Sequence, residues 1–155
     1  RMGTAGALSL LTPAPDQPFF VINGDILTTL DFNDLLKFHD NSSSIATMCV
    51  RTHTYTIPYG VVKSTNENVI SKIEEKPVSS FKVSAGIYIL SPDVLKFVPD
   101  GSYFDMPSLF EVLIEAGHKT MVYHTYDYWI DVGRVEDFEK AKTDFDFLNN
   151  SRYTI

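Results

Sequence analysis

The chain has 155 residues, and its 44% hydrophobic and 13% aromatic content is enough to form a buried core within a single domain. Thirteen Lys and Arg residues against twenty Asp and Glu residues give a net charge of -7, so no basic surface is expected to bind nucleic acid. The single Cys49 excludes a disulfide framework, and no apolar run reaches the roughly 20 residues of a membrane span. These features predict a soluble, cytoplasmic protein with no nucleic-acid or membrane partner.

The first third of the chain alternates between helix-like and strand-like patterns. Residues Ala7 to Leu11 are typical of the end of a helix, and the unbroken apolar run Phe19 to Ile22 predicts a strand buried on both faces. Asp31 is predicted to cap a helix that runs through His39. Ser44 to Arg51 predicts a second buried strand. This strand–helix–strand order indicates an α/β fold.

The middle of the chain changes to a β-rich pattern. Gly60 to Lys63, a turn at Asn66 to Asn68, and Val69 to Glu75 predict an antiparallel hairpin, which a strand at Ser84 to Leu90 follows. The predicted fold class is therefore a Rossmann-like α/β fold: a mixed, mainly parallel sheet with flanking helices and a β-rich insertion. The remaining expected elements are helices at Pro92 to Phe97, Pro107 to Ala116 and Val135 to Phe147, and extended segments at Met121 to Tyr126 and Trp129 to Asp131.

Two acidic residues follow short apolar runs. Asp25 comes after Asn23 and Gly24, where open α/β sheets bind their ligands, and Asp131 ends the run Trp129 to Asp131. Two carboxylates at sheet ends can share one Mg²⁺, which commonly takes one or two carboxylates together with substrate phosphates. For each acid taken alone, an ordinary turn or loop is the favoured interpretation.

Three further motifs have a chemical interpretation and a plain structural one. Glu75 and Lys76 lie before a Pro, where a Lys can bind phosphate and a Glu can accept hydrogen bonds from hydroxyl groups, although such pairs usually lie on a solvated surface. Gly60, after Tyr59, and Gly86 lie in strand-like runs, which indicates either a close approach or a bulge. The four His residues show no metal-ligand spacing and are interpreted as structural.

The order of these motifs resembles the sugar-1-phosphate nucleotidylyltransferase family, which includes mannose-1-phosphate guanylyltransferases and glucose-1-phosphate thymidylyltransferases. The resemblance covers almost the whole chain. It implies that Gly3 to Leu8 border the nucleobase, that Asp25 and Asp131 are the metal ligands, and that Lys76 contacts the sugar phosphate. The other substrate-binding residues that it implies are Gly24, Tyr59, Gly60, Glu75, Gly86 and Tyr88.

The resemblance also implies an activity. A nucleotidyl group would pass from a nucleoside triphosphate, with GTP or dTTP favoured, to a sugar 1-phosphate, with Asp25, Lys76 and Asp131 as catalytic residues and Mg²⁺ as cofactor. The family's Gly-rich triphosphate loop normally precedes these segments, so residues 1–155 are expected to be the C-terminal two-thirds of one nucleotidyltransferase domain, inactive alone. The resemblance leaves a homo-oligomer open.

Two other functions fit parts of the pattern. A non-catalytic regulatory subunit of the same fold would bind a nucleotide sugar, but it would have no need for Asp25, Lys76 and Asp131. A metal-dependent glycosyltransferase would need an Asp-X-Asp motif at a strand end. The motif Asp144 to Asp146 lies instead in the expected closing helix, so this alternative ranks lowest.

Overall fold

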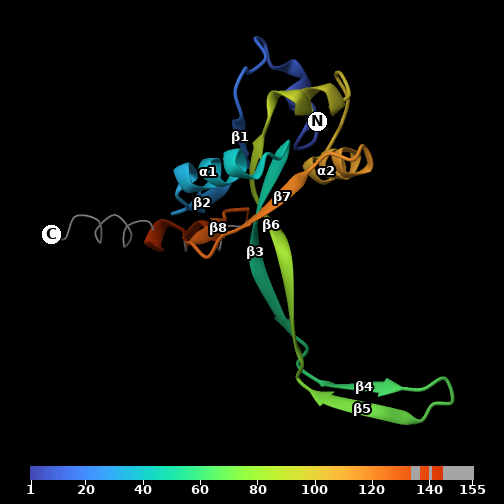
Figure 1. The fold of residues 1–155 in the computed structure, drawn as a ribbon. Coiled ribbons are helices and arrows are strands. Elements are labelled where there is room, and N and C mark those ends of the chain that lie inside the picture. Colours follow the sequence, from blue (N-terminus) through green and yellow to red (C-terminus); the bar gives the residue numbers. More distant parts are fainter. Residues whose placement is uncertain (134–136, 140, 145–155) are drawn as a thin grey trace. The chain divides into compact units, whose positions relative to one another are not determined.

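The protein is described from a computed structural model, which defines residues 1–133, 137–139 and 141–144 (Figure 1). The chain divides into two compact units. The first comprises Arg1–Val50 and the chain from Ser84 onward, and the second comprises Arg51–Val83. Each unit is described by itself, and the assignment of residues 1–155 to one domain stays a prediction.

The first unit is built on a mixed sheet. Strands β1 and β6 are antiparallel, with Phe19 opposite Leu90, whereas β3 and β7 are parallel, with Ala46 opposite Thr120. Ser91 N–H, just after β6, donates to the carbonyl of Ile45, just before β3, at 2.8 Å, so these two neighbours run in opposite directions. Three of the four strands therefore share one direction, but the reversed strand β6 lies between β1 and β3, so only the pair β3–β7 is parallel. The predicted mixed sheet with flanking helices is confirmed, whereas its pairing is mainly antiparallel. The strand order is β1-β6-β3-β7, formed by Phe19–Ile22, Val78–Leu90, Ala46–Thr56 and Thr120–His124.

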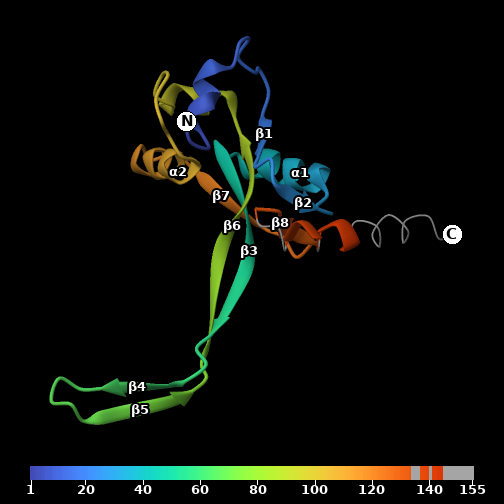
Figure 2. The same ribbon diagram turned by 180° about the vertical axis from the view of Figure 1, so that it is seen from behind.

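Apolar side chains pack on both faces of this sheet because β6 alternates between them. Tyr88 and Leu90 belong to the cluster that packs against α2, while Ile87 and Ile89 belong to the cluster that packs against α1 (Figures 1 and 2). The prediction that β1 is buried on both faces is wrong. Its strand-end residue Ile22 is 43% exposed, because β1 pairs only with β6 and forms the sheet edge in the described part of the chain.

The helix that begins after Asp31 is confirmed. The Asp31 carboxylate accepts a hydrogen bond from Asn33 N–H at 2.8 Å and so caps α1, Phe32–Ser42, which runs three residues beyond the predicted end. The predicted helix near Pro107 is α2, Met106–Glu115. Two shorter helical predictions are 3₁₀ helices instead: η1, Gly6–Leu10, and η2, Pro92–Phe97. Both are short and use the tighter i→i+3 bonds, such as Leu8 N–H to the Ala5 carbonyl at 3.0 Å.

A second, small sheet joins segments that are remote in sequence. Strand β2, Ile26–Thr28, pairs in antiparallel fashion with β8, Trp129–Asp131, so that Ile26 lies opposite Asp131. Residues 137–139 and 141–144 of the predicted closing helix are helical, and its other residues lie outside the described ones. No helix among the described residues is both long and apolar enough to span a membrane.

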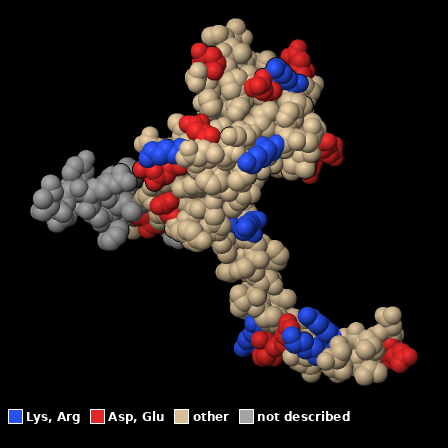
Figure 3. Space-filling view, in the orientation of Figure 1, with Lys and Arg blue, Asp and Glu red and all other residues tan. Residues whose placement is uncertain are grey.

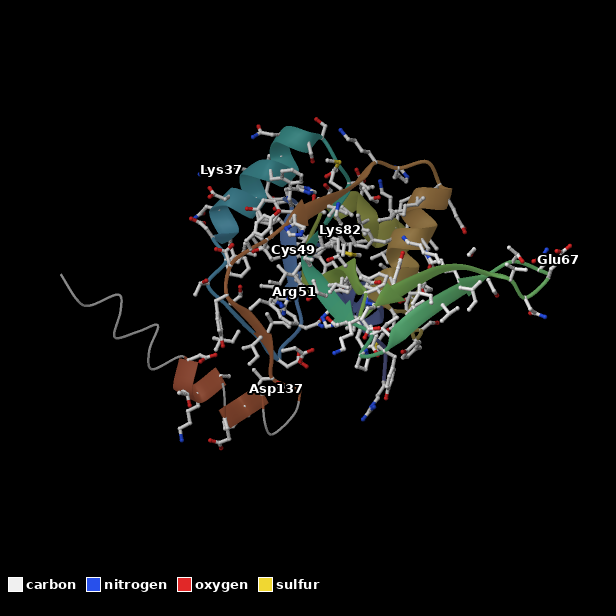
Figure 4. All side chains as sticks on the ribbon, turned by 90° about the horizontal axis from the view of Figure 1, so that it is seen from below. Lys37, Cys49, Arg51, Glu67, Lys82 and Asp137 are labelled. Carbon is white, nitrogen blue, oxygen red and sulfur yellow. The ribbon has the colours of Figure 1, made fainter. Side chains whose placement is uncertain are left out.

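The second unit contains the predicted hairpin. Strands β4, Gly60–Ser64, and β5, Ile70–Glu75, are antiparallel, and Glu67 lies at the turn between them (Figure 4). Glu74 forms ion pairs with Lys63 and Lys72, and the hydrogen bond from Lys72 lowers the pKa of Glu74 below its usual value. In the view of Figure 3, blue and red side chains are intermixed over the hairpin. These charges pair locally on an exposed strand surface.

Candidate functional site

Two adjoining cavities lie in the first unit. The larger has a volume of about 400 Å³ and the smaller about 340 Å³. Thr4 and Asn23 line both of them, and the smaller is completed by Val21, Ile22, Gly24 and Asp25. The larger is completed by Ile26, Ser84, Gly86, Tyr88, Asp105, Pro107, Trp129 and Asp131.

The pairing of β2 with β8 brings the two predicted acids to adjacent segments: Asp131 is the last residue of β8, and Asp25 directly precedes β2. Val132 N–H, next to Asp131, donates to the main-chain carbonyl of Asp25 at 2.8 Å. Both acids are exposed, and they line different cavities: Asp131 the larger and Asp25 the smaller. The structure therefore brings the two segments together at the rim of two cavities that share Thr4 and Asn23.

Hydrogen bonds to neighbouring elements hold β8 in place. The indole N–H of Trp129 donates to the Ala85 carbonyl of β6 at 2.8 Å, and the Thr28 hydroxyl donates to the Tyr128 carbonyl at 2.7 Å. Asp131 Oδ1 accepts from Gly133 N–H at 3.0 Å, which orients the carboxylate. The exposed acid thus extends from a strand that side chains anchor on both sides.

Gly86 is a close-approach position, one of the two interpretations that the sequence allowed. Its φ is +68°, and a Cβ added there would lie 2.8 Å from Nδ2 of Asn23. Asn23 N–H also donates to the Gly86 carbonyl at 2.9 Å. The neighbouring Tyr88 is 4% exposed, and its hydroxyl is 2.9 Å from that of Ser84, so it contributes to the cavity wall from the core. Asn23 is therefore packed directly over the backbone that closes the cavity.

Four of the five remaining predicted residues lie together in the second unit, Arg51–Val83. Gly60 is paired with Glu75 across the hairpin, and Lys76 N–H donates to the Tyr59 carbonyl at 3.3 Å. Lys76 has a φ of 45°, an uncommon conformation for a residue with a side chain. The predicted site residues thus form two groups, this one and the group of Gly24, Asp25, Gly86, Tyr88 and Asp131 in the first unit.

Gly3 lies beside the larger cavity rather than among the residues that line it. It has a φ of +73° and precedes Thr4, which lines both cavities. Sequence reasoning missed Asp105, which lines the larger cavity. Its position directly before Met106 and Pro107 indicates only the start of a helix, and nothing in the local sequence links it to Thr4.

The exposed acids fit Mg²⁺ better than a structural metal. Among the described residues there is no group of three or more His, Cys, Asp or Glu that could hold a metal ion. In the described structure the Asp25 carboxylate and Oδ2 of Asp131 accept no hydrogen bond from the protein, so these oxygens can serve as ligands. Two such carboxylates suit the hard cation Mg²⁺, which keeps several waters and substrate oxygens as its other ligands.

The structural interpretation of His39 agrees with its surroundings. The ring is 2% exposed, with Nδ1 2.8 Å from the Thr47 hydroxyl and Nε2 3.2 Å from the Ser91 hydroxyl. Burial lowers the pKa of His39, which favours the neutral ring. This His joins α1 to the sheet and lines neither of the two cavities.

Comparison with known proteins identifies the family. Residues 1–146 match the family model described as nucleotidyl transferase. The chain belongs to this family. This membership confirms the resemblance that the order of the sequence motifs indicated.

Among named members of the nucleotidyl transferase family, UTP–glucose-1-phosphate uridylyltransferase of Synechocystis sp. is 31% identical over 150 residues, which cover 90% of this chain and 39% of that protein. Mannose-1-phosphate guanyltransferase of Emericella nidulans is 33% identical over 147 residues, which cover 88% of this chain and 39% of that protein. The chain therefore spans about 39% of the length of these curated relatives.

Solved structures show the same fold. HddC from Yersinia pseudotuberculosis has a TM-score of 0.62 at 24% identity, covering 93% of this chain and 63% of that one. A putative glucose-1-phosphate thymidylyltransferase from Bacillus anthracis has a TM-score of 0.65 at 20% identity, covering 91% of this chain and 60% of that one. At these identities the likeness supports the nucleotidyl transferase fold, and the roles of the individual site residues stay predictions.

Proposed function

We propose that this chain is part of an enzyme that transfers a nucleotidyl group from a nucleoside triphosphate to a sugar 1-phosphate and releases pyrophosphate. The observation that carries the proposal is the pairing of β2 with β8, which sets Asp131 opposite Ile26, the residue after Asp25, at two adjoining cavities. Membership of the nucleotidyl transferase family supports it. The names of the relatives, which include guanyltransferases and a uridylyltransferase for sugar 1-phosphates, support the substrate classes.

GTP is the proposed nucleotide, with mannose 1-phosphate or a related hexose or heptose phosphate as acceptor. Several of the relatives are named mannose-1-phosphate guanyltransferases, and HddC from Yersinia pseudotuberculosis has also been solved as a complex with GMP-PN. dTTP is the second choice, because a structural neighbour is described as a putative thymidylyltransferase. A cytoplasmic location remains part of the proposal.

The proposed chemistry is an in-line substitution at phosphorus. A phosphate oxygen of the sugar 1-phosphate forms a bond to the α-phosphorus of the triphosphate, and the bond to pyrophosphate breaks. Since no covalent enzyme intermediate is needed, the protein contributes by aligning the reactants, an effect worth on the order of 7 to 11 kcal/mol in favourable cases. Lys76 would hold the sugar phosphate as a point charge, while Gly60 and Glu75 would contact the sugar.

Asp25 and Asp131 would hold Mg²⁺ through their exposed carboxylate oxygens. A bound Mg²⁺ supplies Lewis-acid neutralisation of phosphate charge. The chain's own residues would keep these oxygens in place: the Trp129 and Thr28 hydrogen bonds fix β8 and β2, and Gly133 N–H orients the Asp131 carboxylate.

The experiment uses the full-length protein. Pyrophosphate release is measured with GTP, dTTP and UTP, each paired with mannose 1-phosphate and glucose 1-phosphate, with Mg²⁺ and with EDTA. We expect turnover with at least one pair, fastest with GTP, and its loss in EDTA. Binding of a nucleotide sugar without turnover of any pair would favour the regulatory alternative, and neither binding nor turnover would refute the proposal.

A binding readout tests the metal ligands separately from turnover. Mg²⁺ with GTP should raise the melting temperature of the wild-type protein, because a ligand that binds only the folded state stabilises it. Asp25→Asn and Asp131→Asn should each reduce the part of this shift that depends on Mg²⁺. An unchanged Mg²⁺-dependent shift in both variants would exclude these residues as ligands.

A further inference from the structure

We infer that Asp105 is a positioning residue that holds the Thr4 loop, residues 2–6, against the cavity and thereby sets the affinity for the nucleoside triphosphate. The inference rests on the proposed function and on the expectation that Gly3 to Leu8 border the nucleobase. Asp105 acts on the cavities through its hydrogen bonds with Thr4, a residue that lines both of them. Three features of the contact between this loop and the start of α2 support this role.

The first feature is that Asp105 does not cap its own helix. It occupies the N-cap position of α2, where an Asp carboxylate normally accepts a hydrogen bond from an N–H of the first turn, but it makes no such bond. Its Oδ1 instead accepts from Thr4 N–H at 3.0 Å and from the Thr4 hydroxyl at 3.3 Å. Asp105 therefore bonds to a residue about a hundred positions away in place of the usual bond to its own helix. Such departures from a local preference are typical of functional sites.

The second feature is that Thr4 caps the helix in place of Asp105. Met106 N–H donates to the Thr4 hydroxyl oxygen at 2.8 Å. Main-chain bonds reinforce this exchange, because Ala5 N–H and Gly6 N–H both donate to the Phe104 carbonyl at 2.9 Å, and Phe104 N–H donates to the Met2 carbonyl at 2.9 Å. The Thr4 loop and the start of α2 therefore form one hydrogen-bonded unit.

The third feature is that the contact leaves no room for larger residues in the loop. A Cβ added at Gly6 would overlap the carbonyl oxygen of Ser102. Since the obstacle is a main-chain atom rather than the end of a flexible side chain, the loop would have to move away. Gly6→Ala therefore disturbs the same contact from the opposite side.

The other oxygen of Asp105 provides a matched control. The Tyr103 hydroxyl donates to Asp105 Oδ2 at 2.6 Å, and this bond, together with that from Thr4 N–H, lowers the pKa of the Asp105 carboxyl. Tyr103→Phe removes the Oδ2 bond but leaves both bonds from Thr4 to Oδ1. It thus tests the carboxylate's surroundings without releasing the Thr4 loop.

Steady-state kinetics of the full-length enzyme test the inference. Asp105→Ala and Gly6→Ala should each raise KM for GTP about tenfold or more, while KM for the sugar 1-phosphate stays within twofold and kcat within threefold. A tenfold change is the scale expected when a hydrogen bond to a charged group is lost. Asp105→Asn retains the Oδ1 acceptor and should restore most of the affinity. Tyr103→Phe should stay within twofold of wild type in all constants.

Two results would overturn the inference in an active enzyme. One is a wild-type KM for GTP in Asp105→Ala, and the other is an equal rise of both KM values, which would indicate general structural damage. If either Ala variant fails to fold, Asp105→Ser takes its place, because Ser is a preferred N-cap residue and is shorter than Asp. In Asp105→Ser the amides of Thr4, Ala5 and Gly6 should undergo hydrogen exchange at least tenfold faster than in the wild type, and unchanged exchange would overturn the inference.

Failure of the proposed function is a separate outcome. It would appear as a folded wild-type protein that turns over no substrate pair. Calorimetric titration with GTP then decides on Asp105: a Kd about tenfold weaker in Asp105→Ala supports the positioning role, and an equal Kd contradicts it. A wild-type protein that binds none of GTP, dTTP and UTP overturns the proposed function and this inference together.

Discussion

Replacing Asp131 with Asn in the full-length protein tests the role of the acid with little change in shape. The Asn side-chain oxygen can still accept the hydrogen bond from Gly133 N–H, which is 3.0 Å long in the wild type, and the pairing of β8 with β2 involves only main-chain atoms. Because Asp131 is exposed, we expect the free energy of unfolding to change by less than about 0.5 kcal/mol.

The catalytic effect should be much larger than the effect on stability. Loss of one preorganised charge-stabilising group reduces kcat by about 100-fold or more, which corresponds to roughly 2.7 kcal/mol in the activation free energy. The assay is pyrophosphate release at saturating GTP, sugar 1-phosphate and Mg²⁺. The reduction should therefore appear in kcat and should not be recovered by adding more substrate.

Asp16→Asn is the matched control for this experiment. It removes the same charge from an exposed residue that lines neither cavity, so its kcat should stay within twofold of wild type. If Asp131→Asn folds normally and keeps near-normal kcat, the assignment of Asp131 as a metal ligand is wrong. If both variants lose activity equally, the effect is one of net charge rather than of the site.

Three further predictions concern the packing of the first unit. Gly86→Ala should lose about 1 to 2 kcal/mol of unfolding free energy because its φ is +68°, and it should lose more because the new Cβ clashes with Asn23. Gly101→Ala is the control: its φ is +60° but the space around it is open, so it should lose only the contribution from φ. Urea denaturation measures both variants. His39→Leu should cost about 1 to 3 kcal/mol of unfolding free energy, because its buried hydroxyl partners lose a hydrogen bond. It should also weaken the pH dependence of stability below about pH 6.5, since the lowered pKa of His39 makes the wild type less stable as the pH falls below the unfolded value. Burial raises the pKa of the Cys49 thiol from 9.0 to about 11. The native protein should therefore resist a thiol reagent at about pH 8 that labels the unfolded chain, and rapid labelling of the native state would contradict this burial. The free energy of unfolding should also fall as the pH rises from 9 towards 11, because the thiol ionises first in the unfolded chain.

The cap of α1 and the hairpin were predictable because both depend on residues close together in sequence. The Asp31 carboxylate needs only the N–H of Asn33 as a donor, and the two hairpin strands need only the short turn between them. Cys49 was likewise expected inside because it lies in an apolar run, and it is fully buried in the interior (Figure 4). The order of the motifs was sufficient to indicate the family, which the match over residues 1–146 confirms.

The exposure of β1 and the type of the two short helices were not predictable in the same way. An apolar run such as Phe19–Ile22 has the same local pattern in a central strand and in an edge strand, and its burial depends on how many neighbours it has. Similarly, a run of five or six helical residues carries too few i→i+4 bonds to distinguish an α-helix from a 3₁₀ helix.

The sequence by itself determined the fold class, the order of the motifs and the identity of the acids, because these follow from local periodicity and residue chemistry. Only the tertiary structure decided which remote segments meet. The pairing of Ile26 with Asp131 and the exchange of capping between Thr4 and Asp105 each join residues about a hundred positions apart. Such contacts depend on the path of the whole chain, since no local pattern specifies the partner of an exposed strand or of a cap.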